Sequence, residues 1–153
     1  MAVYTPIAKE KLSSFLENYN IGSLDKLKGV LEGVENTNYK VITSQDIFIL
    51  TIFEKRVKGQ ELPFFIELQN YLSKKNIRCP SPIPNKEGRY INIIKNKPCV
   101  MMSFLEGMKI HNVTSYHCLQ IGKLAANIHL HTKDFALSRK NSLHQKTGEK
   151  YLI

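Results

Sequence analysis

A polar turn between two β-strand patterns constrains the fold of this chain more than any other feature. The turn covers residues 33–39 and separates spaced apolar residues at 24–31 from an alternating pattern at 39–44. A second apolar run, at residues 47–53, follows closely. Strand patterns joined by such short connections pair side by side, so the sequence predicts a sheet that begins with three antiparallel strands.

The same turn has two interpretations. Gly33 tolerates positive φ, as do Asn36 and Asn38 to a lesser degree, and such a backbone leaves N–H groups free to bind an anion. The segment is therefore either an ordinary hairpin turn or a loop that lies over a polyphosphate. Taken alone, the segment favours the hairpin turn.

Composition indicates one globular unit. The chain has 153 residues, 42% of them hydrophobic, which is enough for a core. No apolar run approaches the ~20 residues that span a bilayer, and residues 1–11 lack a signal-peptide pattern, so we expect a cytoplasmic protein without membrane contact. The cysteines Cys79, Cys99 and Cys118 are far apart and predict neither a disulfide framework nor a zinc site.

The net charge of +9 suits an anionic partner such as ATP or a nucleic acid. Lysine and arginine are spread from residue 9 to residue 150 without a dense block. Solvated surface explains this spread, so we expect no nucleic-acid partner. A basic nucleic-acid-binding domain stays as a third interpretation.

The remaining elements are three helices and two strands. The first helix follows Thr5, which can cap it, and ends before Gly22; the second covers residues 60–75. Alternate prolines hold residues 79–84 extended as a connector, and strands follow at 90–94 and 99–104. The third helix runs from residue 114 or 115 to about residue 131. Its expected buried face contains Cys118, Ile121, Ala125 and Ile128.

This order predicts an α+β fold that resembles the N-terminal lobe of the protein-kinase-like fold. That lobe is a five-stranded antiparallel sheet with an inserted helix, followed by a hinge and the first helix of a helical C-terminal lobe. Six segments, from residue 1 to about residue 143, resemble bacterial homoserine kinases of the aminoglycoside phosphotransferase and choline kinase-like superfamily. They are residues 1–5, 22–24, 32–38, 49–57, 62–65 and 103–107.

The resemblance implies transfer of the ATP γ-phosphate to the hydroxyl of L-homoserine, a step of threonine biosynthesis, with Mg²⁺ bridging the phosphates. It implies a nucleotide-binding lobe at residues 1–106 and an incomplete C-terminal lobe at 107–153. Asn36 is the expected main contact of the phosphate loop, while the Ser103 carbonyl and the Leu105 N–H are expected to pair with adenine. The implied nucleotide-binding residues are Gly33, Val34, Glu35, Asn36, Thr37, Asn38, Thr51, Met102, Ser103 and Leu105.

The resemblance leaves the phosphate-binding cation open. Thr51 stands where the wider kinase pattern has a lysine. Homoserine kinases of this type resemble the present chain in having threonine at that position. Lys55 or Arg56 either replaces that lysine or is a surface charge at a strand end. Glu61 and Glu67 of the second helix either anchor such a cation or belong to a solvated helix face.

Catalytic and metal-binding residues are missing from the sequence pattern. The family's His-x-Asp loop followed by Asn does not occur, and the tripeptide that begins at Asp134 resembles a metal-binding motif only by chance. His129 and His131 point to different sides of a helix and do not form a metal pair. We therefore expect the catalytic groups and most Mg²⁺ ligands in a C-terminal lobe that this chain lacks, and exposed apolar surface on the third helix.

Three interpretations of the chain itself stay open: a truncated product, one piece of a split kinase, or a fragment of a longer protein. Its activity in isolation is an open question. The alternative functions are another small-alcohol kinase of the superfamily, acting for example on choline or an aminoglycoside, and a non-catalytic fragment that binds nucleotide or a partner protein.

Overall fold

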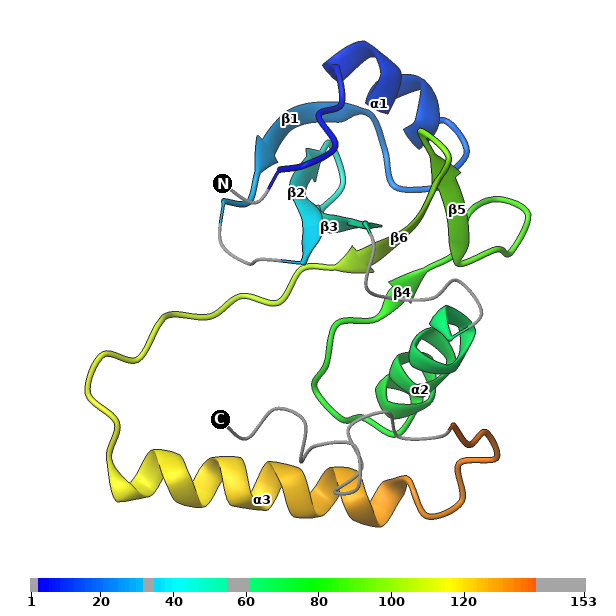
Figure 1. Cartoon of the computed structure of the whole chain (residues 1–153). Coiled ribbons are helices and arrows are strands. Elements are labelled where there is room, and N and C mark those ends of the chain that lie inside the picture. The colour runs from blue at the N-terminus through cyan, green and yellow to red at the C-terminus, as the bar shows by residue number, and fades with distance from the viewer. Residues whose placement is uncertain (1–2, 32–34, 55–60, 140–153) are drawn as a thin grey trace, which may run out of the picture.

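The computed structural model describes residues 3–31, 35–54 and 61–139, which form three helices and six strands (Figure 1). In chain order these elements are α1 (Lys9–Leu16), β1 (Leu24–Gly29), β2 (Asn36–Thr43), β3 (Ile47–Phe53), α2 (Leu62–Lys74), β4 (Pro82–Ile83), β5 (Ile91–Ile94), β6 (Lys97–Ser103) and α3 (Ser115–His131). The order confirms the predicted α+β fold with a helix inserted after the third strand.

All strands belong to one antiparallel sheet in the order β1-β2-β3-β6-β4, with β5 paired to β6. Every second residue of β2 and β3 is buried, because successive side chains of a strand point to opposite faces. Between β5 and β6 the chain turns at Lys95 and Asn96. Both residues have positive φ, as a tight two-residue hairpin turn requires.

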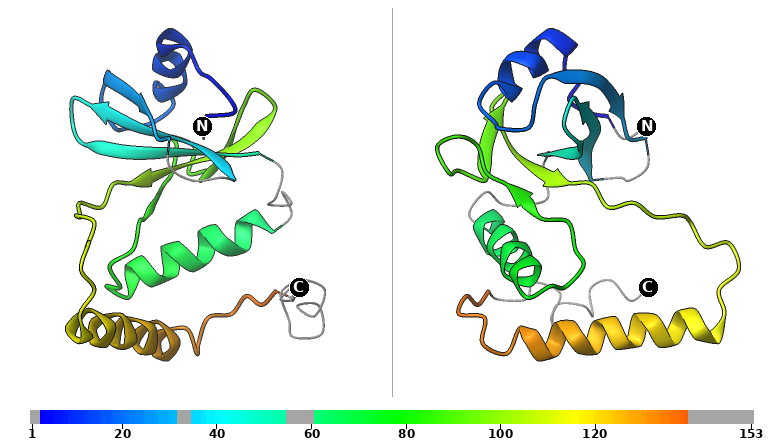
Figure 2. Two further views of the ribbon diagram at one scale, coloured as in Figure 1. Left: turned by 60° about the vertical axis from the view of Figure 1, so that its left-hand side comes forward. Right: turned by 180° about the vertical axis from the view of Figure 1, so that it is seen from behind.

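A helix covers each face of the sheet (Figure 2). The core beneath α1 contains Leu12, Leu16, Tyr19, Ile21, Tyr39, Val41, Phe48, Leu50, Ile52, Cys99 and Met101. On the opposite face, Leu62 and Ile66 of α2 pack against the sheet. Strand β6 serves both sides, since Cys99 and Met101 join the first core while Val100 and Met102 join the second.

Three details differ from the sequence prediction. Strand β2 begins at Asn36 rather than at Tyr39, so the turn predicted for residues 33–39 is too long. Thr5 does not cap α1, whose N-cap is Ala8; the Thr5 hydroxyl donates to Glu54 instead. The proline-rich connector is extended as predicted, but Pro82–Ile83 also pairs with β6, which adds a sixth strand.

Helix α3 has the predicted bounds and begins with a capping box between Thr114 and His117. Its predicted buried face is wrong among the described residues, because Cys118 is exposed and Ile121 is 67% exposed. Figures 1 and 2 show why: α3 lies beyond α2, away from the sheet, and an extended segment joins it to β6. The expectation that α3 exposes apolar surface is thus confirmed for this chain.

The segment after α3 returns to α2 through aromatic contacts. The ring centroid of Phe135 lies 5.8 Å from that of Phe64 and 5.2 Å from that of Tyr71. Phe135 is the middle residue of the tripeptide that begins at Asp134, and it is half-buried against two aromatic rings of α2. Within the described ranges, no helix combines the length and the apolar character needed to cross a membrane.

Candidate functional site

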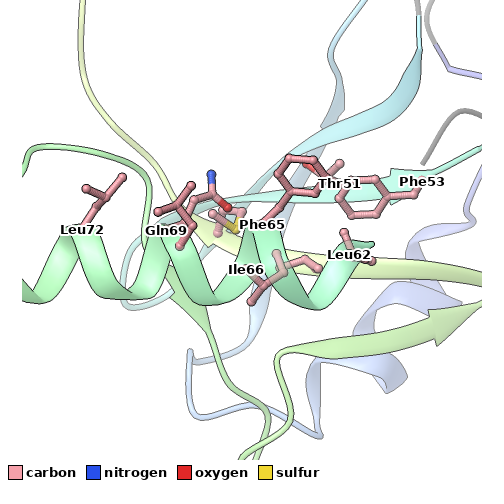
Figure 3. Close-up of a pocket in the computed structure, with 10 residues that line it drawn as sticks. Thr51, Phe53, Leu62, Phe65, Ile66, Gln69 and Leu72 are labelled. Atoms are coloured by element: carbon pink, nitrogen blue, oxygen red, sulfur yellow. The ribbon is translucent and has the colours of Figure 1, made fainter. Parts of the chain in front are cut away.

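A cavity of about 410 Å³ lies between the sheet and α2 (Figure 3). Its walls are apolar except for the side chains of Thr51 and Gln69. The lining residues are Thr51, Phe53, Leu62, Phe65, Ile66, Leu68, Gln69, Leu72, Val100 and Met102. Such a cavity, with few polar groups on mostly apolar walls, is typical of a small-molecule site. Two residues predicted from the resemblance, Thr51 and Met102, line it.

Thr51 is a polar residue of the cavity wall, and Asn38 is its partner on the neighbouring strand. They are paired across β2 and β3, so both side chains lie on the face that carries α2. The Thr51 hydroxyl donates to Asn38 Oδ1 at 2.8 Å. Because that bond occupies the amide oxygen, the Asn38 Nδ2 group is the part of this pair that presents donors.

Asn36 lies on the same face of β2 and is paired with Phe53, a residue of the cavity wall. Its Oδ1 atom is buried and accepts no hydrogen bond from any residue that the structure describes. A buried amide oxygen without a donor costs about 1–3 kcal/mol, so packing alone does not explain an asparagine at this position. A ligand that offers a hydroxyl or a bound water would satisfy this oxygen.

Only part of the phosphate loop predicted for residues 33–38 lies within the described residues. Gly33 and Val34 lie outside the described residues, and Glu35 is exposed just before β2. Asn36, Thr37 and Asn38 begin strand β2 rather than forming a loop. Their predicted contact with the nucleotide stays a prediction. Strand alternation then divides these three: the two asparagines face the cavity side, and Thr37 points into the opposite face of the sheet.

The predicted hinge follows directly from β6. Met102 is buried in the cavity wall, and Ser103 ends the strand. The Ser103 N–H donates to the Ser81 carbonyl at 2.8 Å, while the Ser81 N–H donates to the Ser103 hydroxyl at 2.9 Å. These two bonds fix the end of β6 against the connector. Leu105, two residues on, is 39% exposed.

Lys40 is a cationic residue of this region that the sequence did not single out. It is paired with Ile49 on the cavity face of β2, and its Nζ atom lies 3.9 Å from the ring centroid of Phe104. Such a contact stabilises a partly desolvated ammonium. The alternation of Asn36, Asn38 and Lys40 along one strand face is the signal that identifies it once the start of β2 is known.

Arg139, at the far end of the described chain, places a cationic side chain against α2. Lys55 and Arg56 lie outside the described residues. Glu61 instead pairs with Arg139, with 3.5 Å between Oε2 and Nη2. The Arg139 guanidinium also lies 4.9 Å from the ring centroid of Phe65, which lines the cavity. Glu67 is exposed, as expected for a solvated helix face.

Metal-binding groups are not gathered anywhere in the described part of the chain. No three histidine, cysteine, aspartate or glutamate side chains there lie close enough to hold an ion. His117 belongs to the capping box of α3, and His131 bonds the Asn127 carbonyl at 2.9 Å. Residues of this region therefore do not fit a Mg²⁺ ion by themselves.

Two solved kinases share the fold of this chain. A spectinomycin phosphotransferase, solved with ADP and spectinomycin, matches 93% of this chain and 42% of its own with a TM-score of 0.66 and 16% identity. A microcompartment-associated aminopropanol kinase matches 92% of this chain and 48% of its own with a TM-score of 0.67 and 16% identity. At this identity the likeness establishes the fold alone.

The chain belongs to the phosphotransferase enzyme family (APH), whose sequence profile matches residues 26–149. Its curated homologues include the homoserine kinases of Agrobacterium fabrum and Parvibaculum lavamentivorans. Each is 43% identical over 143 residues, which is 94% of this chain. The chain spans 44% of the length of each relative, so the match is to part of those enzymes.

Proposed function

We propose that this chain is the nucleotide-binding part of an ATP-dependent kinase that phosphorylates the hydroxyl of L-homoserine. The observation that carries the proposal is the 43% identity over 143 residues to homoserine kinases. The likeness to a spectinomycin phosphotransferase that was solved with ADP supports nucleotide binding at the same lobe. The apolar cavity beside β6 supports it independently, because an adenine ring favours a desolvated site with a few placed polar groups.

In this proposal the adenine ring binds near the end of β6. The Ser103 carbonyl and the Leu105 N–H pair with its edge, and the mutual hydrogen bonds of Ser103 and Ser81 hold that backbone in place. Asn36 and Asn38 face the phosphate portion, with Thr51 orienting the Asn38 amide. The contribution of these residues to phosphoryl transfer is positioning, which supplies much of the rate in this class of reaction.

Mg²⁺ neutralises phosphate charge in such reactions when it is bound. Since the described residues offer no cluster for the ion, we assign its ligands and the group that orients the attacking hydroxyl to a C-terminal lobe. That lobe is also the proposed partner of α3, whose apolar side chains are exposed here. They include Tyr116, Leu119, Ile121, Leu124 and Leu130.

Calorimetric titration of the chain with ATP and with adenosine tests nucleotide binding. We expect both ligands to bind, with ATP tighter because only ATP reaches the asparagines of β2. Absence of binding by both ligands would contradict the proposal and favour a fragment that binds a partner protein. Binding of nucleic acid that persists at high salt would favour a basic nucleic-acid-binding domain.

Complementation tests the family assignment at the level of activity. The chain is mixed with the separately expressed C-terminal part of the Agrobacterium fabrum homoserine kinase, and phosphorylation of homoserine is measured with choline and spectinomycin as alternative acceptors. We expect homoserine phosphorylation from the mixture only. The control is the corresponding part of the spectinomycin phosphotransferase, whose matched part is only 16% identical to this chain. Activity of the chain with the control partner, but not with the homoserine kinase part, would favour the small-alcohol kinase alternative.

A further inference from the structure

An N-terminal segment, residues 3–7, crosses the sheet beside the start of β2. The N–H groups of Tyr4 and Thr5 donate to Thr37 Oγ1 at 2.9 and 3.0 Å. Two residues further along β2, the Tyr39 hydroxyl accepts from the Ile7 N–H at 3.1 Å and donates to the Thr5 carbonyl at 2.9 Å. The segment is therefore fastened to β2 by side chains that point away from the cavity.

A partly buried carboxylate joins this segment to the rest of the sheet. Glu54 Oε1 accepts from the Thr37 hydroxyl at 2.6 Å and from the Thr5 hydroxyl at 2.7 Å. Lys97, at the start of β6, forms an ion pair with Glu54 and also donates to Thr5 Oγ1 at 2.7 Å. We call these four residues, Thr5, Thr37, Glu54 and Lys97, the threonine clamp.

Burial of its two threonines makes the threonine clamp stiff. Thr37 is fully buried and Thr5 is 4% exposed, so no water replaces a bond that is lost there. Burial alone would raise the pKa of Glu54, but the hydrogen bonds and charge of Lys97, with those from Thr37 and Thr5, hold that pKa below its usual value. The carboxylate is thus charged at neutral pH and accepts charge-assisted bonds.

Thr37 connects the threonine clamp to the cavity side of β2. Thr37 lies between Asn36 and Asn38, whose side chains point to the other face of β2. Fixing the Thr37 side chain fixes the backbone of both neighbours, and with it the direction in which each amide projects. In the proposed function the adenine contacts lie at the end of β6, where Ser103 is paired with Phe48, whereas Asn36 and Asn38 are paired with residues toward the other end of β3.

We propose that the threonine clamp is a positioning device for the phosphate end of the nucleotide. It rests on the proposed function. The clamp residues do not touch the ligand; they hold Asn36 and Asn38 in the geometry that binds phosphate. Loosening the clamp therefore lowers the affinity for ATP and leaves the affinity for adenosine unchanged.

The chain offers a matched pair of variants for the test. Thr37→Val removes a hydroxyl that accepts from two backbone N–H groups and donates to Glu54. Thr43→Val removes a hydroxyl that also makes three hydrogen bonds. That hydroxyl accepts from the N–H groups of Gln45 and Asp46 and donates to the Asp46 carbonyl. Both threonines are buried on the same face of β2, about 20 Å apart at roughly 3.3 Å per residue.

The readout is the ratio of ATP affinity to adenosine affinity for each folded variant. Thr37→Val is expected to lower the ratio about tenfold, equivalent to one misplaced hydrogen bond to a charged group. Thr43→Val is expected to keep the wild-type ratio, and Thr37→Ser, which retains the hydroxyl, to restore it. Equal ratios for Thr37→Val and wild type would overturn the inference. Failure of the wild type to bind ATP would instead overturn the proposed function.

If Thr37→Val does not fold, as judged by circular dichroism, Lys97→Met takes its place. That variant removes the ion pair at the exposed edge of the clamp while keeping every backbone bond of Thr37. It is expected to lower the same ratio by a smaller factor, about threefold. An unchanged ratio in the folded Lys97→Met protein would then overturn the inference.

Discussion

Asn36 and Asn38 should respond in opposite ways to the same substitution, although they lie on one face of one strand. The Asn36 Oδ1 atom is buried with no hydrogen-bond donor among the described residues, whereas Asn38 Oδ1 accepts from Thr51 at 2.8 Å. Truncation to alanine removes an unsatisfied polar atom in the first case and a satisfied one in the second. The backbone, strand and loss of volume are matched between the two variants.

The magnitudes follow from the state of each oxygen. Asn38→Ala loses one net hydrogen bond, so its free energy of unfolding should fall by about 1 kcal/mol. Asn36→Ala removes a desolvation penalty of about 1–3 kcal/mol and loses the packing of one amide, so its free energy of unfolding should stay constant or rise by about 1 kcal/mol. The variants should therefore differ by about 1–2 kcal/mol.

Urea denaturation followed by circular dichroism measures this difference. With an m-value of about 2 kcal/mol per molar, the midpoint of Asn36→Ala should lie about 0.5–1 M above that of Asn38→Ala. ATP affinity should fall in both variants, so Asn36→Ala would gain stability while losing binding. A midpoint for Asn36→Ala at or below that of Asn38→Ala would refute the reasoning.

Two further predictions concern ionisable groups. Because the folded-state pKa of Glu54 is depressed, its charge stabilises the fold above the ordinary glutamate pKa of about 4.3, and this stability is lost as the pH falls through the folded pKa. Urea midpoints measured against pH should therefore fall on the acid side in the wild type and less steeply in Glu54→Gln, and parallel curves would contradict this role. Burial raises the pKa of the Cys99 thiol to about 12, so a thiol reagent at neutral pH should label exposed Cys118 rapidly and leave Cys99 unmodified until urea unfolds the chain. Mass spectrometry of the labelled peptides checks the order, and early labelling of Cys99 would show that the core opens locally.

Local patterns predicted the elements well where the pattern was periodic. Strand β3 and helix α3 have the predicted bounds, since each is defined by its own alternation or amphipathic period. The start of β2 was wrong because Asn-Thr-Asn has turn propensity. In the structure Thr37 is fixed by the N–H groups of Tyr4 and Thr5, more than thirty residues away, and this tertiary contact overrides the local preference.

The candidate site shows the same division. Thr51 and Met102 were predicted from the family resemblance, and they line the cavity because strand alternation directs them there. The pair of Glu61 and Arg139 joins residues far apart in sequence, and no local pattern contains it. The burial of α3 was also mispredicted, because an amphipathic period indicates an apolar face but not what covers it.

Strand β6 forms a wall shared by two compartments, with Cys99 and Met101 toward one and Val100 and Met102 toward the other. Insertion of a single residue within β6 would exchange the two sets, moving core side chains into the cavity and cavity side chains into the core. Substitutions can therefore reshape the cavity one residue at a time, whereas a change in strand length would disturb both compartments together. The spacing from the β5–β6 turn to Ser103 should accordingly vary less among functional relatives than the identity of the residues within it.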